Sequence, residues 1–160
     1  MCSSDLVYCL RLNGIPFTEA EVKGVMQAWQ ELSPHADCAA GLRRLKRRFK
    51  LVALSNGEQA YLEHLEKERM RFGFDALISV QRAGVFKPHP AVYRTAATVL
   101  GLEPQEIMLV AAHSFDIMGA RACGYRGAYV NRYRLPYEES PHRPDLEVLD
   151  FVELAGALGV

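Results

Sequence analysis

The sequence has 160 residues, the size of one domain, and a chain of this length buries enough surface to fold without disulfides or a structural metal. Hydrophobic residues make up 49% and charged residues 24%, which is typical of a globular protein and excludes a disordered or fibrous one. Nineteen basic residues balance nineteen acidic ones, so the net charge gives no reason to expect nucleic acid or an anionic membrane as a partner.

Targeting and redox signals point to a soluble protein. No segment approaches the roughly 20 apolar residues of a membrane span, and the first residues lack the pattern of a signal peptide. The four cysteines contain no C-x-x-C pair and no zinc-like spacing. We therefore expect reduced thiols and a cytoplasmic location.

The first part of the chain is predicted to be helical. Apolar residues recur at three-to-four spacing on both sides of a turn at 13–16, and Thr18 with Glu21 forms a capping box for the second helix. A run of basic residues follows over 41–50, and its apolar residues share one helical face. This arrangement favours a solvated helix over a nucleic-acid patch.

From residue 51 onward, short apolar segments alternate with helical ones. We expect strands at 51–54, 76–80, 107–111 and 127–131, and helices at 58–71, 90–100, 116–123 and 151–158. Uniformly apolar strands that alternate with helices are typical of a parallel sheet covered on both faces. The predicted fold class is therefore α/β and doubly wound, with helices in front.

Polar residues at the ends of the predicted strands are the candidates for chemistry, because ligands bind beyond the carboxyl ends of such strands. Three sets lie there: Ser55-Asn56-Gly57, Lys87 between Phe86 and Pro88, and His113-Ser114-Phe115-Asp116.

Each set also has a purely structural interpretation. Ser55 suits an anion at a helix start, but it also forms a capping-box pattern with Glu58. Lys87 is either a solvated lysine or a fixed cation for an anionic substrate. Asp116 could serve only as a helix cap, and His113 could bind substrate or satisfy the turn.

Taken together, the three sets resemble motifs of the haloacid dehalogenase-like (HAD) superfamily and, within it, of the type II 2-haloacid dehalogenases. Residues 54–57 are similar to the second motif of the family. Residues 86–93 are similar to the third motif, including its tyrosine, and residues 110–124 are similar to the fourth. The resemblance covers most of the chain from about residue 28 onward and extends to Arg132.

The resemblance implies a Rossmann-like sheet and the hydrolytic dehalogenation of 2-haloalkanoic acids. In that reaction a carboxylate displaces halide from carbon, and water then hydrolyses the ester. Ser55 and Asn56 would hold the substrate carboxylate, and Tyr93 would shape the pocket. Lys87 would stabilise the nucleophile and the growing charge, and Asp116 would orient Lys87 or the hydrolytic water. No cofactor is expected.

The fourth motif favours dehalogenation over a phosphatase, which is one alternative interpretation. Magnesium-dependent phosphatases of the superfamily usually carry two aspartates in this motif, and the first of them falls on Ala112 here. With only Asp116 left, a magnesium site is weakened. Ala111 and His113 stand where some type II enzymes have serine and asparagine, and we keep His113 as a candidate substrate-binding residue.

The first motif of the family, D-x-Y-G-T-L on a central first strand, has no counterpart upstream of Ser55. The resemblance then implies that residues 1–36 are the carboxyl-terminal part of a helical cap and that 37–160 are the α/β core. We expect the chain to be inactive alone. The strands at 51–54 and 107–110 would close up on each other, pair with another chain as in a homodimer, or aggregate. A non-catalytic HAD-like fragment or binding protein is a further alternative.

Overall fold

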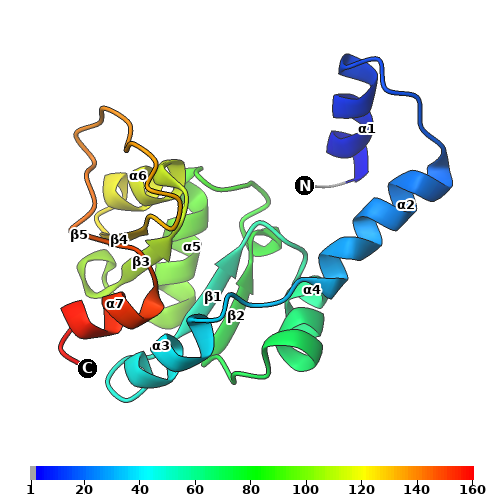
Figure 1. Ribbon diagram of the computed structural model, residues 1–160. Helices are drawn as coiled ribbons and strands as arrows, with labels where there is room; N and C mark the ends of the chain where they lie inside the picture. Colours follow the sequence, from blue (N-terminus) through cyan, green and yellow to red (C-terminus); the bar gives the residue numbers. More distant parts are fainter. Residues whose placement is uncertain (1–2) are drawn as a thin grey trace.

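The computed structural model of the protein describes residues 3–160 and contains two parallel β-sheets with helices around them (Figure 1). One sheet pairs two strands, β1 (Val52–Ser55) and β2 (Ala76–Ser79). The other has the strand order β3 (Met108–Ala111), β4 (Arg126–Val130) and β5 (Leu146–Val148). The predicted α/β class with parallel strands is confirmed.

Seven α-helices are found in the described part of the chain. They are α1 (Ser3–Leu12), α2 (Glu19–Ala28), α3 (Cys38–Leu45), α4 (Gln59–His64), α5 (Pro90–Leu100), α6 (Ser114–Ala122) and α7 (Phe151–Ala157). A π-helical segment, Leu65–Met70, continues α4, and short 3-10 turns lie at Trp29–Glu31, Val80–Arg82 and Pro104–Glu106.

The helix ends follow the local signals in the sequence. The capping box of Thr18 and Glu21 at the start of α2 is confirmed. Helix α5 begins with Pro90 in its first position, where the missing N–H costs nothing. It ends at Gly101, whose φ of 64° lies in the left-handed region that glycine adopts without strain.

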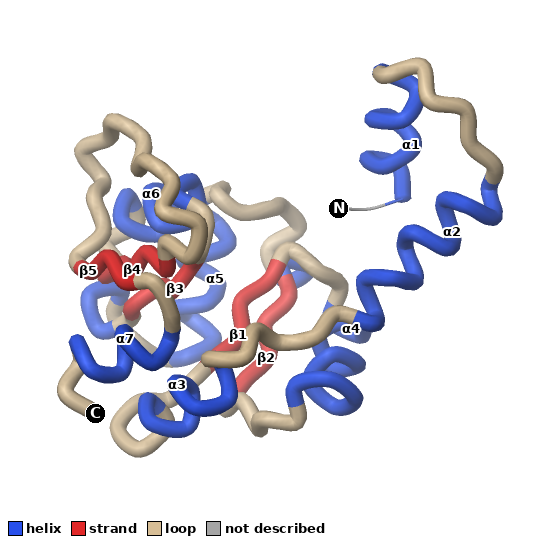
Figure 2. The backbone as a smooth tube through the Cα atoms, in the orientation of Figure 1, coloured by secondary structure: helices blue, strands red, loops and turns tan. Residues whose placement is uncertain are grey.

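Helices cover the strands on both faces (Figure 2). On one face, α3 and α7 pack against each other and bury Leu42, Leu45 and Leu154 with Val130 of β4. On the other face, α5 and α6 enclose a second cluster, made of Tyr93, Ala97, Ala120 and Tyr125. The core therefore consists of two apolar layers with the strands between them.

The two sheets do not meet. Strands β1 and β3 pair only with β2 and β4, and a cavity of about 840 Å³ lies between them, lined by residues of both strands. All residues of β1 and β3 are only partly buried, whereas four of the five residues of β4 are buried. Of the three arrangements expected for these strands, closing up on each other is wrong, because the space between them stays open.

Helices α1 and α2 form an arm that extends away from the strands (Figure 1). Neither helix contains a buried residue. Among the described residues, no helix has the length and apolar character needed to cross a membrane.

Two local predictions were wrong. Ser55 and Glu58 form no capping box, because α4 begins at Gln59 and Glu58 makes no side-chain cap bond. The basic helix predicted over 41–50 ends at Leu45, since the chain continues in i→i+3 turns at Arg47 and Arg48. Like charges four residues apart in this run disfavour further helix. Strand β5 was not predicted, because it is three residues long and lies in a proline-rich segment.

A partly buried ion pair connects three segments of the core. Both carboxylate oxygens of Asp37, at the start of α3, accept hydrogen bonds from the Arg132 guanidinium, at 2.7 and 2.9 Å. The Phe151 N–H, at the start of α7, donates to the same carboxylate at 2.9 Å. These bonds, that of Arg132 foremost, lower the pKa of Asp37 to about 2.

We expect this pair to make stability depend on pH. Because the folded pKa of Asp37 lies below its unfolded value of 3.8, its contribution is full above about pH 4 and is lost as the pH falls toward 2. The loss amounts to about 2 kcal/mol of unfolding free energy. Urea unfolding between pH 6 and pH 2 measures it, and Asp37→Asn is the control. A wild-type curve parallel to that of D37N would contradict the prediction.

Candidate active site at the carboxyl ends of the strands

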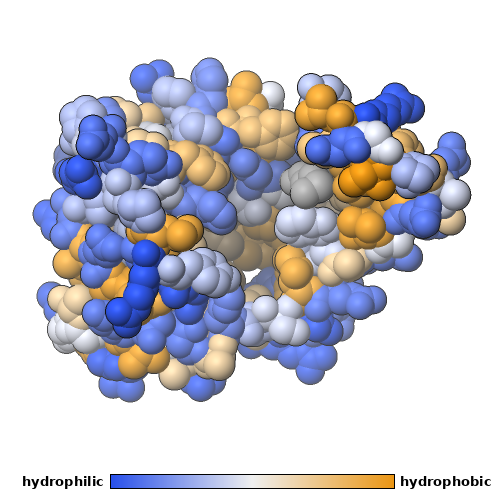
Figure 3. Space-filling view, turned by 45° about the horizontal axis from the view of Figure 1, so that its top comes forward, coloured by the Kyte–Doolittle hydropathy of each residue, from blue (hydrophilic) through white to orange (hydrophobic). Residues whose placement is uncertain are grey.

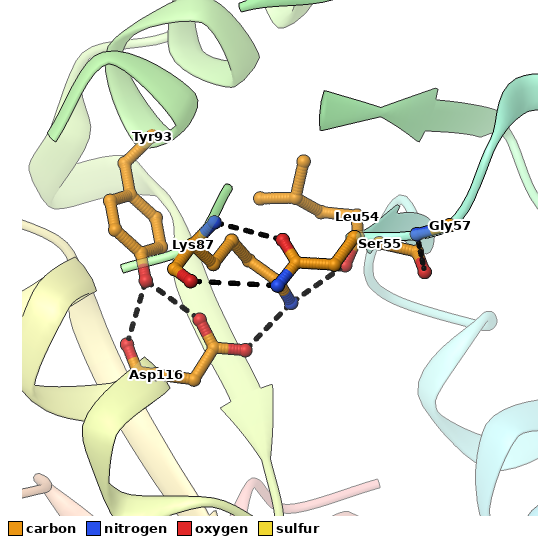
Figure 4. Close-up of polar contacts among 7 residues, drawn as sticks. Leu54, Ser55, Gly57, Lys87, Tyr93 and Asp116 are labelled. Carbon is orange, nitrogen blue, oxygen red and sulfur yellow. Dashed lines mark hydrogen bonds and ion pairs between the residues drawn. The ribbon is translucent and has the colours of Figure 1, made fainter. Parts of the chain in front are cut away.

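Lys87 is held at the carboxyl end of β1 by main-chain contacts (Figure 4). The Lys87 N–H donates to Oδ1 of Asn56 at 2.8 Å, and the Asn56 amide donates to the Lys87 carbonyl at 3.5 Å. Asn56 directly follows β1, so this pair of bonds fixes the loop of Lys87 to the end of the strand. The side-chain amide of Asn56 is thus engaged in positioning Lys87.

The Lys87 ammonium links the two sheets. Its Nζ donates to the Leu54 carbonyl of β1 at 3.0 Å and to Oδ2 of Asp116 at 2.7 Å. Asp116 lies in the first turn of α6, directly beyond β3. The side chains of Lys87 and Asp116 are 12% and 8% exposed, so the ion pair is largely screened from water. The interpretation of Asp116 as a mere helix cap is not supported, because its carboxylate binds Lys87 instead.

Tyr93 completes the support of Asp116 from the other side (Figure 4). Its hydroxyl donates to Oδ1 of Asp116 at 2.7 Å, and its own carbonyl accepts a hydrogen bond from the Tyr125 hydroxyl at 2.7 Å. Tyr93 is fully buried, and this burial together with the neighbouring carboxylate raises the pKa of its phenol far above the ordinary value. The phenol therefore remains a hydrogen-bond donor, and both oxygens of Asp116 have a partner.

Ser55 and His113 lie close in sequence to this network but bind elsewhere. The Ser55 hydroxyl accepts a hydrogen bond from the Gly57 N–H at 3.0 Å, in a turn that leads into α4. His113 is exposed, caps α6 through its backbone carbonyl, and packs its ring 5.5 Å from the Phe115 ring. The structure thus brings Asn56, Lys87, Tyr93 and Asp116 into one network. Ser55 stands at its edge and His113 stands outside it.

The site offers one fixed cation and one fixed carboxylate at the mouth of the cavity between β1 and β3. Within residues 3–160, no group of three or more His, Cys, Asp or Glu side chains is placed to hold a metal ion. Such an ammonium, held in a water-poor place, can stabilise negative charge that develops on a neighbouring group.

Sequence reasoning missed two features of this site. The Leu54 carbonyl, an acceptor for Lys87, belongs to an apolar strand and leaves no signal in the sequence. Gly119 is small enough for its helix to approach a neighbour closely, but the sequence does not say which neighbour. A Cβ at Gly119 would lie 2.7 Å from both the Pro88 Cβ and the Tyr93 hydroxyl oxygen, so no larger residue fits behind the network.

We therefore expect Gly119→Ala to destabilise the protein by about 1–3 kcal/mol, because the added methyl group must displace Tyr93 or Pro88. The matched control is Gly156→Ala in α7, where nothing lies within 4 Å of the position that the methyl group would take and a gain of about 0.5–1 kcal/mol is expected. Urea unfolding of both variants measures the difference. Equal stabilities of the two variants would argue against the close packing at Gly119.

Comparison with known proteins connects this site to one family. A profile of the haloacid dehalogenase-like hydrolases matches residues 5–124. The (S)-2-haloacid dehalogenase H-109 of Pseudomonas putida is 34% identical over 152 residues, which cover 94% of this chain and 68% of that relative. The (S)-2-haloacid dehalogenase of Pseudomonas sp. strain YL is 37% identical over 123 residues, which cover 76% of this chain and only 53% of the relative.

A solved structure of the same family is also similar to this chain. The L-2-haloacid dehalogenase from Xanthobacter autotrophicus with chloropropionic acid covalently bound aligns with a TM-score of 0.84 and 29% sequence identity. The alignment covers 98% of this chain and 73% of that chain. Sequence motifs, profile, relatives and fold agree. The chain belongs to the haloacid dehalogenase-like hydrolases, in the branch of the 2-haloacid dehalogenases.

Proposed function

We propose that the site to which this chain contributes hydrolyses 2-haloalkanoic acids to 2-hydroxy acids and halide. The observation that carries the proposal is the buried Lys87–Asp116 pair at the carboxyl ends of the strands, backed by Tyr93. The names of the similar proteins, and the chloropropionic acid bound covalently to one of them, support the substrate class.

The proposed reaction has two steps. A carboxylate oxygen attacks the carbon that carries the halogen, the carbon–halogen bond breaks, and halide leaves with its electron pair. Water then hydrolyses the ester, which yields the 2-hydroxy acid and restores the carboxylate. Lys87 would stabilise the attacking carboxylate and the charge that develops around it, and Asp116 would hold the Lys87 ammonium in place.

The remaining assignments also rest on this proposal. Ser55 and Asn56 would bind the substrate carboxylate from the end of β1, although the Asn56 side chain already binds Lys87. His113 is a candidate contact on the exposed side. We also propose residues 1–36 as the carboxyl-terminal part of a helical cap and 37–160 as the core, a boundary supported by the Asp37–Arg132 pair. A cytoplasmic location and a homodimer remain predictions.

The nucleophile is the one part without a candidate among the described residues. The only carboxylate that contacts Lys87 there is Asp116, and both of its oxygens are already hydrogen-bonded. In the family that the motifs resemble, the nucleophile is the aspartate of D-x-Y-G-T-L, which the 160 residues lack. The test therefore uses a chimera in which an amino-terminal segment with that motif precedes Met1.

Chloride release from 2-chloropropionate by this chimera tests the proposal. Release that requires Lys87 supports it, and a chimera that is folded but releases no chloride contradicts it. Hydrolysis of p-nitrophenyl phosphate in place of 2-chloropropionate would move the protein to the phosphatase alternative.

We expect chloride release by the chimera to survive a chelator. The reason is that Ala112 takes the place of one of the two aspartates that hold magnesium in the phosphatases, which leaves Asp116 alone. The measurement is the rate with and without excess EDTA. Loss of activity that added magnesium restores would show that a metal site is required after all.

A further inference from the structure

The α1–α2 arm is held to the rest of the chain at its carboxyl end. In the space-filling view, the molecule is hollowed beside the arm, so that the arm stands apart from most of the core (Figure 3). Its most extensive contact with the rest of the chain is made by the 3-10 turn Trp29–Glu31, which lies against the π-helical segment Leu65–Met70. The orientation of the arm therefore depends on the bonds between these two short segments.

Arg69 makes most of these bonds. Its guanidinium donates to the Glu31 carbonyl at 2.6 Å, to the Leu32 carbonyl at 3.0 Å and to Ser33 Oγ at 2.9 Å. The last carbonyls of a helix have no partners within it and form the negative end of its dipole. A guanidinium, whose donors form a fixed fork, therefore matches both the charge and the spacing of the carbonyls at the end of the arm.

Two further side chains of the same helix bind the preceding carbonyls. The Tyr61 hydroxyl donates to the Trp29 carbonyl at 2.7 Å. Nε2 of His64 lies 3.3 Å from the Gln30 carbonyl, to which it can only donate. Four successive carbonyls of the arm, those of residues 29 to 32, are thus bound by side chains at positions 61, 64 and 69.

The alignment of these side chains depends on the π-helical segment. In an α-helix, residues three or four apart share a face, whereas the i→i+5 bonds of a π-turn bring residues five apart into line. Tyr61 and His64 are three apart, but His64 and Arg69 are five apart. The π register is visible in the bond from the Arg71 N–H to the Glu66 carbonyl, at 2.7 Å. Arg69 therefore faces the arm because the helix is π-helical between positions 64 and 69.

In an α-helical register, Glu68 would take the place of Arg69. It follows His64 by four residues, and its carboxylate would then face the negative end of the arm, which repels it. Both side chains border the same polar cavity beside the arm. The π register is also strained, because it ends at Arg71, whose φ of 49° lies in the left-handed region that a residue other than glycine rarely adopts. Such strain persists only where surrounding contacts stabilise it.

We propose that the segment Leu65–Met70 is a register switch for the α1–α2 arm. In the π register, Arg69 holds the arm in the orientation that the structure shows. In an α register, Glu68 replaces Arg69 and the arm is released. The helix that carries the switch begins at Gln59, two residues after Gly57, so it connects the arm to the turn at the end of β1. The inference goes beyond the proposed function and does not depend on it, because it concerns the position of the arm alone.

The experiment is NMR relaxation on the 160-residue chain labelled with ¹³C and ¹⁵N. Backbone order parameters of both α2 and α5 should be about 0.85 in the wild type, as for rigid backbone. Arg69→Leu removes the bonds to the arm but keeps a good helix former, so the order parameters of α2 should fall below about 0.6 while those of α5 stay unchanged. The coupling through the hydrogen bond from the Arg71 N–H to the Glu66 carbonyl should be replaced by one from the Met70 N–H.

Two changes at Lys67 serve as controls. Lys67→Leu alters a side chain that is 82% exposed and pairs with its neighbour Glu68, so α2 should stay rigid. Deleting Lys67 leaves Arg69 four residues after His64, so an ordinary α-helix keeps the guanidinium on the arm. The order parameters of α2 should therefore stay near 0.85 in the deletion variant as well.

Three results would overturn the proposal: an α2 that is already mobile in the wild type, an α2 that stays rigid in Arg69→Leu, or equal release of α2 by Lys67→Leu. Release in Arg69→Leu with the coupling between Arg71 and Glu66 intact would contradict a change of register, and so would release by the deletion of Lys67. None of these measurements involves halide release, so the proposed function is tested separately.

Discussion

Replacing Lys87 with methionine is expected to lower the free energy of unfolding by about 3–5 kcal/mol, the cost of breaking a buried ion pair by removing one partner. The substitution keeps an unbranched side chain that is one atom shorter, but it leaves the Asp116 carboxylate with Tyr93 as its remaining side-chain partner. It also removes the bond to the Leu54 carbonyl, which connects the sheet of β1 to the helix after β3. Urea unfolding of the 160-residue chain measures the loss.

Two comparisons make this expectation specific. Lys67 forms an ion pair with Glu68 at 3.3 Å, but its side chain is 82% exposed, so Lys67→Met should change stability by no more than about 0.5 kcal/mol. The double variant Lys87→Met/Asp116→Asn should be more stable than Lys87→Met alone, because it no longer buries an unpaired charge. If K87M lowered the free energy of unfolding no more than K67M does, the Lys87–Asp116 pair would not hold the two sheets together.

The sequence was sufficient for most elements of the fold, because each has a local cause. Helix α5 matches its predicted limits, since a proline starts it and a glycine ends it. Helix α3 is shorter than predicted, and β5 was overlooked, because neither limit is set by a pattern of apolar residues. β5 exists only through its pairing with β4, which is a contact between distant parts of the chain.

The candidate site, too, could be predicted from the sequence only in part. Spacing alone placed Lys87 and Asp116 at strand ends, but nothing in it could show that their side chains meet across 29 residues at 2.7 Å. Their pairing came from the family resemblance. Ser55 illustrates the opposite case, because its capping-box pattern with Glu58 is local and yet not used. The hydroxyl accepts the nearer Gly57 N–H instead.

The cavity could not be predicted from sequence at all. Each strand beside it has the pattern of an ordinary buried strand, and the expected results for such neighbours were closure, pairing with another chain or aggregation. In the structure, β1 and β3 are not paired with each other, and a cavity lies between them. On one face, α3 and α7 are in tight contact, since a Cβ at Gly41 would lie 2.4–2.5 Å from Phe151.

The largest effect on activity should come from supplying a carboxylate to this cavity. Alone, the 160-residue chain should release no chloride from 2-chloropropionate above the uncatalysed rate, because Lys87 and Asp116 can position a nucleophile but neither can replace one. The chimera, in which a segment with the D-x-Y-G-T-L motif precedes Met1, should release chloride, because the aspartate of that segment supplies the missing carboxylate.

A chimera with asparagine in place of that aspartate is the matched control, since it differs only in the reacting group. It should fold and release no chloride. A folded aspartate chimera that releases no chloride would contradict the dehalogenase assignment. Release by the 160-residue chain alone would show that a nucleophile exists within it, and Asp116 would be the first carboxylate to replace by asparagine, because it alone contacts Lys87 among the described residues.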